Sequence, residues 1–596
     1  MLDLQGLAAA LALVLAMLAV SWGVRRSTST TLDFYLARRQ VGSFLNACAI
    51  CGDYFSAASF LGVAGAVYAS GLDGVWFATG FAAGFLVLLL FLAAPLRRAG
   101  QFSIPDFLAH RFSSQGVRVT AVAVVQLIVL IYLIPQMAAA GLTWDTLVGR
   151  GLGGLSPYAT GILLTTIAIV VHAVVGGMRG TTWNQALQFG LLFFTVFLMT
   201  VLVVGGGFSY PEAVERISRK PVGVPARLSP EQLRAPGAGD RSNLELARSV
   251  MTPAGYDRVL SELTSEAGRI DVLLPAQNRL HPHRPMRFAE PGSRYGLGQQ
   301  IALIVTLLLG TAGLPHIVNR YFTTTSGRAA RTSTVWVLGL AGAFYFLAVM
   351  LGVAARSELP RMVAPGTTDA NFVDGVVRVP EQALLLLANE LGGGPLLGLV
   401  ATAALAAILS TVAGLLIAAA VSWGHDVYEQ FINPYAPESR RILFGQIAVI
   451  LTASMAAAIG IAITSLNFRP RVALMVTWAF AVAGSSFTPI FLLCVWWRRV
   501  TASGAIFGMI VGATTAVALI GLDLAGRTVG WLPSVPFGSF PSIVAAPAAA
   551  LTAIAVSLSS TSWSEPVALW ARMHGTAMER RQALLARLAA RGEGPP

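Results

Sequence analysis

The segment Cys51–Gly62, CGDYFSAASFLG, lies inside a long apolar run and is the most informative stretch of the chain. It places Asp53 beside Gly52 among residues that otherwise suit a lipid bilayer. An aspartate at the centre of a membrane helix costs about 3 kcal/mol on insertion scales. The neighbouring glycine weakens the helix at the same point. Either this segment is not a membrane helix, or its polar residues are there to bind something.

The composition of the whole chain also indicates a membrane protein. Its 596 residues are 55% hydrophobic and only 12% charged, whereas charged residues make up about a quarter of a soluble domain. The net charge is +13, but the arginines lie between apolar segments. This favours a lipid bilayer as partner and argues against nucleic acid. The three cysteines predict neither a disulfide framework nor a metal site.

Thirteen apolar segments are long enough to cross a bilayer, which takes about 20 residues. The first is not a cleaved signal peptide, because its positive charges, Arg25 and Arg26, follow the apolar run. We number the segments zero to twelve. They lie near residues 5–24, 43–68, 74–95, 121–148, 158–177, 184–206, 297–318, 333–355, 395–424, 442–465, 472–496, 504–523 and 541–560.

The distribution of arginine predicts the orientation. Most arginines outside the long segment 207–296, Arg320 among them, fall in loops that are cytoplasmic if the N-terminus is outside and the C-terminus is cytoplasmic. We expect a multi-pass protein of the bacterial cell inner (plasma) membrane. The predicted units are an extra helix with its loop (1–42), a first five-helix repeat (43–206), an extracellular insertion (207–296), a second five-helix repeat (297–500), two C-terminal helices (501–560) and a cytoplasmic tail (561–596).

Segment 207–296 reads as either a small extracellular cap or a partly disordered insertion. Its sequence HPHRP (281–285) has two histidines but no nearby cysteine, so we expect no metal there. The tail sequence MERRQALLARLAAR (578–591) is amphipathic and basic. It suits either the inner leaflet or a short solvated helix.

Two of the predicted helices contain breaks. Helix one is interrupted around Gly52–Ser56, and helix six carries Gly310, Gly313 and Pro315. Because the two lie five spans apart, the breaks predict two inverted five-helix repeats. The alternative is that glycine and proline are simply common in membrane helices.

Helix eight presents a face of small residues spaced for one side of a helix. They are Ala407, Ser410, Thr411, Gly414 and Ala418. Two hydroxyls facing the free carbonyls of a broken helix would form an oxygen cage for a small cation. Alternatively, the face serves only for packing, with each hydroxyl bonded to its own helix.

Several long motifs resemble the sodium:solute symporter family, and within it the cation/acetate, or short monocarboxylate, branch. They are DFYLARRQVGSFLNACAICGDYFSAASFLG (33–62), FSIPDFLAHRF (102–112), GTAGLPHIVNRYFTT (310–324), LAAILSTVAGLLIAAAVSWGHDVY (405–428) and VAGSSFTPIFLLCVWWRR (482–499). The resemblance implies an all-α membrane protein with about 13 transmembrane helices. Its core would be a five-plus-five inverted repeat with broken helices one and six. The insertion has no counterpart that we can match residue by residue.

The resemblance also implies a sodium site between helices one and eight. Its ligands map to the hydroxyls of Ser410 and Thr411 and to the carbonyls of Ala407, Gly52 and Phe55. An alignment from Asp53 instead of Gly62 moves the helix-one carbonyls to Cys51 and Tyr54. In the first alignment, which we prefer, Asp53 lies beside the ion and tunes its binding.

Four residues are expected at the neighbouring substrate cavity. Ser56 and Ser59 follow the break, and Tyr132 and Gln136 lie one turn apart on helix three. The alternative for Gln136 is a helix–helix hydrogen bond.

The function expected is import of a small organic anion of the acetate, propionate or pyruvate type, driven by sodium through alternating access. The alternatives are a proton-coupled transporter of the same fold, or a sodium symporter for another small solute such as an amino acid. We expect no enzyme activity, no organic cofactor and no metal beyond sodium. His316 and His425 read as structural caps near helix ends. The sequence does not predict the oligomeric state.

Overall fold

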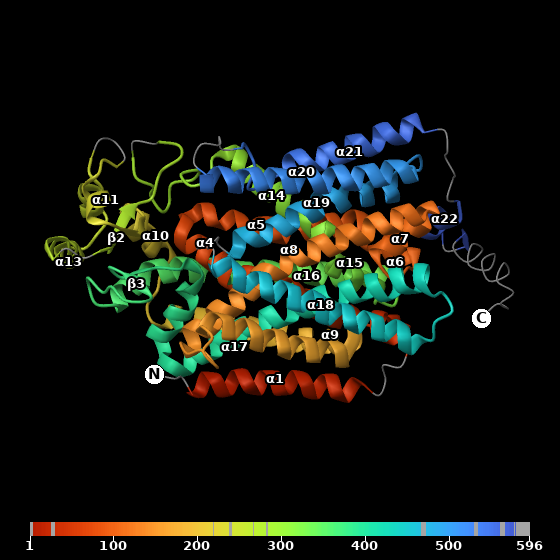
Figure 1. The fold of residues 1–596 in the computed structure, drawn as a ribbon, viewed down its shortest axis with the longest axis horizontal. Helices are drawn as coiled ribbons and strands as arrows, with labels where there is room; N and C mark the ends of the chain where they lie inside the picture. The colour runs from red at the N-terminus through yellow and green to blue at the C-terminus, as the bar shows by residue number, and fades with distance from the viewer. Residues whose placement is uncertain are drawn as a thin grey trace.

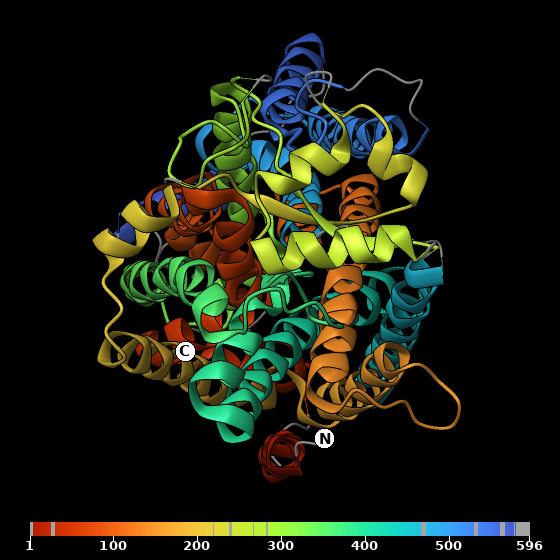
Figure 2. The same ribbon diagram turned by 90° about the vertical axis from the view of Figure 1, so that its left-hand side faces the viewer.

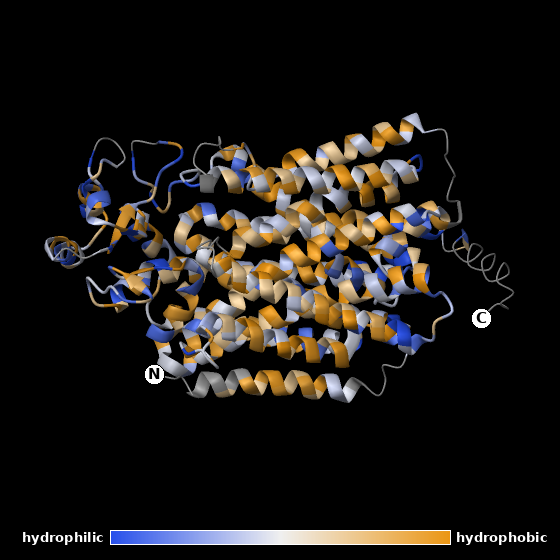
Figure 3. Cartoon of the chain, viewed as in Figure 1, coloured by the Kyte–Doolittle hydropathy of each residue, from blue (hydrophilic) through white to orange (hydrophobic). Residues whose placement is uncertain are grey.

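The computed structural model describes residues 4–25, 30–218, 220–237, 241–265, 268–281, 284–465, 472–529, 535–560, 567–576 and 578–579. Its long helices run side by side along the longest axis (Figure 1). These helices are apolar along most of their length, and hydrophilic residues gather at both ends of the bundle (Figure 3). The long helices and their immediate continuations are α1 (Leu4–Arg25), α3 (Ser43–Tyr54), α4 (Val63–Ser70), α5 (Val75–Val87), α6 (Ala93–Ala99), α8 (Gln115–Val148), α9 (Pro157–Gly205), α14 (Leu297–Gly313), α15 (Pro315–Phe322), α16 (Gly327–Met362), α17 (Ala383–Val421), α18 (Glu438–Ser465), α19 (Val472–Trp496), α20 (Ala502–Val529) and α21 (Ser542–Ser559).

Shorter helical elements connect or extend the long ones. They are α2 (Thr31–Leu36), α7 (Ile104–Phe112), α22 (Val567–His574), the 3₁₀ turns η1 (Ala37–Arg39), η3 (Gly71–Gly74) and η6 (Pro380–Gln382), and the π-helical turns η2 (Ala58–Gly62), η4 (Leu88–Leu92) and η7 (Ser422–Ile432).

The described residues contain nine helices long and apolar enough to span a membrane, or ten if the bent pair α14 and α15 counts as one span. Helix occupies each apolar segment, but the number of thirteen spans remains a prediction. Helix α9 covers two predicted segments. Its backbone leaves the helical region at Gly177 (φ 52°, ψ −161°), a conformation open mainly to glycine. The run therefore consists of two helices that meet at Gly177.

The first break separates α3 from η2 and α4. Helix α3 ends at Tyr54, and Phe55 follows with a non-helical backbone (φ −78°, ψ 73°). The amide of Ser56 then donates to the carbonyl of Tyr54, two residues earlier, at 2.8 Å. Helical structure resumes at Ala58, so the predicted interruption lies just after Asp53.

The second break separates α14 from α15, whose axes differ by 41°. Leu314 adopts an extended conformation (φ −66°, ψ 122°) directly before Pro315. Proline disfavours the helical region for the residue that precedes it and begins helices well. The sequence Leu314–Pro315 therefore encodes this break locally.

Helix α17 is the central element of the bundle. Its most apolar window is completely buried, and it contacts α3, α8, α9, α16 and α18. A Cβ at Gly414 would overlap the Asp53 carboxylate, and a Cβ at Gly52 would overlap the carbonyl of Gln185 in α9. Glycine at both positions lets α3 enter between α17 and α9.

The insertion is a folded cap with some β structure. It contains α10 (Tyr210–Ser218), β1 (Gly223–Leu228), α11 (Pro230–Arg234), α12 (Asn243–Arg248), α13 (Pro253–Thr264) and β2 (Ile270–Pro275). Strands β1 and β2 pair antiparallel, and a short second ladder joins β3 (Phe372–Val373) to β4 (Val376–Val377). Five buried apolar residues form its own core: Leu233, Ala247, Val259, Ile270 and Val272.

The cap lies across one end of the bundle (Figure 2). Helix α1 begins at this same end, and α22 lies at the opposite end (Figure 1). The N-terminal helix therefore starts on the side of the insertion, as the predicted orientation requires. Most of the basic tail, including residues 580–591, lies outside the described residues, as does His283 of the HPHRP sequence.

Candidate ion and substrate site

The predicted sodium ligands of helix eight lie against the break in helix one. The hydroxyl of Ser410 donates to the carbonyl of Ala407 at 2.9 Å. The hydroxyl of Thr411 lies 3.1 Å from the same carbonyl and 2.8 Å from the backbone oxygen of Asp53. Each hydroxyl therefore bonds its own helix, as the packing alternative expects, and Thr411 also bonds the broken helix.

Two carbonyl oxygens at the break lose their helical partners. The amide of Ser56, four residues after Gly52, donates to Tyr54 instead. The amide of Ser59, four residues after Phe55, donates to Ser56. The carbonyls of Cys51 and Tyr54, required by the other alignment, do accept backbone hydrogen bonds. The hydrogen-bond pattern thus favours Gly52 and Phe55 as the available oxygens.

Asp53 forms a buried ion pair that the sequence did not predict. Its Oδ2 lies 3.2 Å from Nε of Arg320 in α15, and neither side chain is exposed (0% each). Arg320 also donates to the hydroxyl of Thr182 at 2.7 Å and to Oε1 of Gln185. The amide of Gln185 in turn donates to the carbonyl of Ser410 at 2.8 Å. One hydrogen-bonded chain therefore joins α3, α15, α9 and α17.

This pair corrects the sequence-based placement of Arg320 in a cytoplasmic loop. The charge follows an apolar run, which is the pattern of a loop arginine, but the chain continues after the break as α15, in which Arg320 is fully buried. The sequence did contain a sign that a buried polar group would need partners here. The apolar run of α9 includes three amide side chains, all buried: Asn184, Gln185 and Gln188.

Unsatisfied polar atoms gather beside the same break. The hydroxyl of Ser56, Nε2 of Gln136 and both ring nitrogens of His316 are buried without a hydrogen-bond partner among the described residues. A buried donor or acceptor left unpaired costs about 1–3 kcal/mol. Four such atoms in one region are characteristic of a binding site rather than of a packed core.

Three of the four predicted substrate residues meet here. The ring of Tyr132 contacts that of His316 at a centroid distance of 5.4 Å, and its hydroxyl faces Ser56. Oε1 of Gln136 accepts from the backbone amide of Ala57 at 3.4 Å. The fourth, Ser59, turns away, because its hydroxyl lies 3.0 Å from Tyr345 Oη and 3.2 Å from the carbonyl of Tyr54.

His316 corrects another sequence interpretation. It lies in the first turn of α15, but neither ring nitrogen has a hydrogen-bond partner among the described residues, so its side chain does not cap the helix end. Its position directly after Pro315 at a predicted break was the signal that could have identified it.

A cleft of about 1430 Å³ lies between the cap and the bundle. It is lined by Arg227 and Asp271 of the cap strands and by Arg356 and Arg378 of the bundle side. A second, small cavity shares Leu142, Glu381, Gln382 and Val472 with the cleft and reaches Ala57. The small cavity therefore lies between the cleft on the insertion side and the break in helix one.

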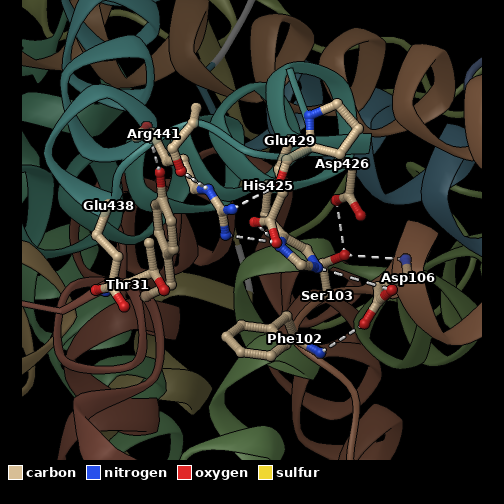
Figure 4. A network of polar contacts seen from close by, with 12 residues as sticks. Thr31, Phe102, Ser103, Asp106, His425, Asp426, Glu429, Glu438 and Arg441 are labelled. Carbon is tan, nitrogen blue, oxygen red and sulfur yellow. Dashed lines mark hydrogen bonds and ion pairs between the residues drawn. The ribbon is translucent and has the colours of Figure 1, made fainter. Parts of the chain in front are cut away.

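A second polar network occupies the opposite end of the bundle, around α7 and η7 (Figure 4). Arg118 contacts Asp426 at 2.9 Å and Asp106 at 3.1 Å. His425 contacts Glu429 at 2.9 Å, so it belongs to this network rather than acting as a cap. Burial alone would raise the pKa of Asp106, but its contacts with His425 and Arg118 hold that pKa below its usual range.

The arrangement at this end resembles a metal site only in part. Ligand atoms of Asp106, His425 and Asp426 lie within 4.8 Å of one another. The guanidinium of Arg118 bonds both carboxylates, so a positive charge already stands where a cation would bind. The described residues here form an ion-pair network.

The sequence and fold of this chain match known transporters. The profile of the sodium:solute symporter family matches residues 34–512. The chain is 32% identical to the "Monocarboxylic acid transporter" of Corynebacterium glutamicum over 534 residues, covering 87% of this chain and 84% of the relative. It is 30% identical to the "Uncharacterized symporter YwcA" of Bacillus subtilis over 516 residues, covering 86% and 85%.

The fold also matches a solved transporter. A Na⁺-coupled sialic acid symporter in a substrate-bound outward-open state aligns over 94% of this chain and 99% of its own, with a TM-score of 0.63 and 15% identity. At that identity the match concerns the fold alone, and the fold is the mostly helical transporter architecture expected from the sequence. With the family match, the extent of the two relatives and the broken helices in place, the chain belongs to the sodium:solute symporter family and is a transporter of small solutes.

Proposed function

We propose that this protein is a sodium-coupled symporter that imports a short monocarboxylate by alternating access. The observation that carries the proposal is the set of oxygens where the break of helix one meets α17. The carbonyls of Gly52 and Phe55 lack their helical hydrogen-bond partners. The carbonyl of Ala407 and the hydroxyls of Ser410 and Thr411 lie on α17, on the other side of this site. Neutral oxygens with a nearby carboxylate suit a small hard cation.

Sodium at this position would join helix one to helix eight. Each hydroxyl can donate its proton to a carbonyl and still present a lone pair to the ion. The Asp53 carboxylate would add negative charge near the ion while Arg320 holds it in place. Binding of the ion would therefore fix the break in one arrangement and shape the adjoining substrate site.

The choice of substrate rests on the similarity to the monocarboxylic acid transporter of Corynebacterium glutamicum. Transport of one sodium ion with one monocarboxylate moves no net charge, so only the concentration gradients drive it. A second cation per cycle would add about 2.3 kcal/mol for each 100 mV of membrane potential.

Uptake of labelled acetate into proteoliposomes tests the proposal. We expect accumulation with an inward sodium gradient and none with equal sodium on both sides. Unlabelled propionate and pyruvate should compete, whereas glucose and proline should not. Strong competition by proline would indicate a symporter for another small solute.

Proton coupling is the second candidate, because Oδ1 of Asp53 is buried without a hydrogen-bond partner. The same proteoliposomes distinguish the two ions. Uptake driven by a proton gradient in the absence of sodium would favour the proton as coupling ion and contradict the sodium site.

We further propose that the protein lies in a bacterial inner membrane with the cap outside and α22 on the cytoplasmic side. The two relatives are bacterial proteins, and the arginine distribution agrees with this orientation. Residues 43–206 and 297–500 would form the two inverted repeats. A cysteine introduced at the exposed Asp257 of the cap should react with an impermeant maleimide applied to intact cells.

A further inference from the structure

His316 is a buried imidazole with no hydrogen bond to either nitrogen among the described residues. We propose that His316 donates a hydrogen bond to the carboxylate of the transported anion, and that this contact selects a carboxylate over a neutral analogue. The inference rests on the proposed function, because it assigns the substrate's charged group to one side chain. It names a residue that neither the motifs nor the family match identify as a substrate ligand.

The buried histidines of this protein differ in a way that separates a structural role from a binding role. Nδ1 of His172 lies 2.6 Å from the hydroxyl of Ser21 and 3.2 Å from the amide nitrogen of Asn184. Nδ1 of His425 lies 2.9 Å from Glu429. These two imidazoles find partners in the folded chain. His316 is equally buried (2% exposed) and finds none.

The other unsatisfied groups lie around the same point. Tyr132 links them, because its ring packs edge-on against His316 and its hydroxyl faces Ser56. Gln136 lies one helical turn after Tyr132 on α8. The Oε1 atom of Gln136 accepts a hydrogen bond from the backbone amide of Ala57. Its Nε2 atom has no hydrogen-bond partner among the described residues.

The leftover groups match the chemistry of a carboxylate. A carboxylate only accepts hydrogen bonds, and its two oxygens offer about four lone-pair directions. A neutral imidazole supplies one N–H, the Gln136 amide supplies two, and the Ser56 hydroxyl supplies one. A neutral analogue such as acetamide has a donor NH₂ in place of one carboxylate oxygen, which would face these donors unfavourably.

The surroundings of His316 also favour negative charge. His316 is the second residue of α15, so it lies at the positive end of the helix dipole. Arg320 follows one turn later on the same helix. Its partner Asp53 lies in α3, beside the break of helix one and the proposed ion site. The anion and the sodium ion would then bind next to each other, the anion at the broken helix six and the ion at the broken helix one.

The test compares four proteins in proteoliposomes: the wild type, His316→Phe, His316→Gln and His172→Phe. Phenylalanine keeps the ring that packs against Tyr132 but removes both nitrogens. Glutamine restores an N–H donor. His172→Phe is the matched control, because it removes a buried membrane histidine away from the proposed site. The readouts are half-saturation for labelled acetate and competition by unlabelled acetate and acetamide.

We expect the His316→Phe variant to raise acetate half-saturation about tenfold to a hundredfold, because a hydrogen bond to a charged group is lost. Competition by acetamide should stay unchanged, so the preference for acetate over acetamide falls by the same factor. His316→Gln should remain within about threefold of the wild type, because its amide can donate the same bond. His172→Phe should keep the wild-type preference.

The inference is overturned if His316→Phe keeps both the wild-type acetate half-saturation and the wild-type preference for acetate. If this variant does not reach the membrane, His316→Asn replaces it, because asparagine is polar but too short to reach the same point. Retained preference in that variant would likewise contradict the inference. Failure of the wild type to take up any of acetate, propionate or pyruvate would instead contradict the proposed function.

Discussion

The aspartate in the middle of helix one is held by an arginine from helix six. Two charges at 0% exposure are costly to desolvate, and their mutual attraction offsets that cost only while both are present. The pair also fixes Gln185, whose amide reaches the carbonyl of Ser410 in the ion site. Asp53 therefore has two roles in our proposal: it is a partner of Arg320 and a source of negative charge near sodium.

Single substitutions in this pair should lower stability more than the double substitution. We expect Asp53→Asn or Arg320→Gln alone to destabilise the protein by about 3–5 kcal/mol, because each leaves one buried charge unpaired. The double variant should recover much of the stability that the single variants lose, measured as the thermal unfolding midpoint in detergent. Its half-saturation for sodium should remain raised, because the carboxylate is still absent.

Arg361→Gln is the control for these variants, since Arg361 forms an ion pair with Glu358 while 60% of its side chain is exposed. Surface pairs contribute about 0–1 kcal/mol. A double variant no more stable than either single one would show that the two charges do not compensate each other.

The hydroxyls of Ser410 and Thr411 should matter for sodium far more than for folding. The double variant Ser410→Ala/Thr411→Ala should raise sodium half-saturation by about tenfold or more, equivalent to about 1.4 kcal/mol of binding free energy. Uptake measured against sodium concentration checks this. Thr402→Ala is the matched control, because its buried hydroxyl bonds only its own helix, at 2.7 Å from the carbonyl of Gly398. An unchanged sodium curve in the double variant would remove both hydroxyls from the site.

At the scale of the elements, the ion site depends on how closely α3 approaches α17 and α9. Small residues permit such approaches in membranes, where close packing rather than water exclusion holds helices together. A Cβ at Gly414 of α17 would overlap Asp53 of α3, and a Cβ at Gly52 of α3 would overlap the carbonyl of Gln185 of α9. The break in α3 needs this contact, because the Thr411 hydroxyl bonds its last turn.

Gly414→Ala should therefore destabilise the protein and reduce sodium-dependent uptake together. An added methyl group would overlap the Asp53 carboxylate, and moving that carboxylate away would disturb its buried ion pair with Arg320. Gly342→Ala in α16 is the control, because a Cβ there meets nothing within 4 Å. It should be neutral or stabilise by about 0.5–1 kcal/mol through helix propensity. Unfolding midpoints of the two purified variants give the comparison, and equal midpoints would contradict it.

At the scale of the whole molecule, the cap is attached to the bundle by polar contacts at one end. Asp271 in β2 receives two hydrogen bonds from the guanidinium of Arg378, both at 2.8 Å. The carboxylate of Asp73 accepts from the backbone amides of Gly292, Arg294 and Tyr295. These contacts set the position of β1 and β2 over the cleft.

The contact between Asp271 and Arg378 should weaken only in acid. The hydrogen bonds from Arg378 lower the pKa of Asp271 from its ordinary value of 3.8. Because the folded-state pKa is the lower one, the stabilisation is complete above pH 3.8 and disappears as the pH falls through the folded value. Hydrogen exchange of residues 223–275 should therefore stay constant from neutral pH down to about pH 4 after correction for the intrinsic rate.

Asp271→Asn should show increased exchange of the cap already at neutral pH. Asp257→Asn, on the exposed face of α13 in the same cap, is the control and should behave as the wild type. Protection in Asp271→Asn equal to that of the wild type would mean that the apolar core of the cap, rather than this ion pair, sets its attachment.

The sequence by itself determined the features that depend on neighbouring residues. The apolar segments, the break after Asp53, the break at Leu314–Pro315 and the hydroxyl-bearing face of α17 all follow from local composition and spacing, because proline, glycine and helix periodicity act over a few residues. The division of α9 into two helices near Gly177 was predicted as well, by the separate apolar segments 158–177 and 184–206. The β ladders of the cap were not predicted, because strand pairing depends on contacts that local pattern does not specify.

Only the tertiary structure decided which polar groups are partners. Asp53 and Arg320 lie 267 positions apart. Taken alone, Asp53 was interpreted as a charge beside the ion site and Arg320 as a loop charge. The sequence places His316 near a helix end. In the folded chain its ring is buried, and both nitrogens lack a hydrogen-bond partner among the described residues. Whether a buried polar group has a hydrogen-bond partner depends on which groups the packing brings within about 3 Å of it. That distance is set by the arrangement of helices far apart in the chain.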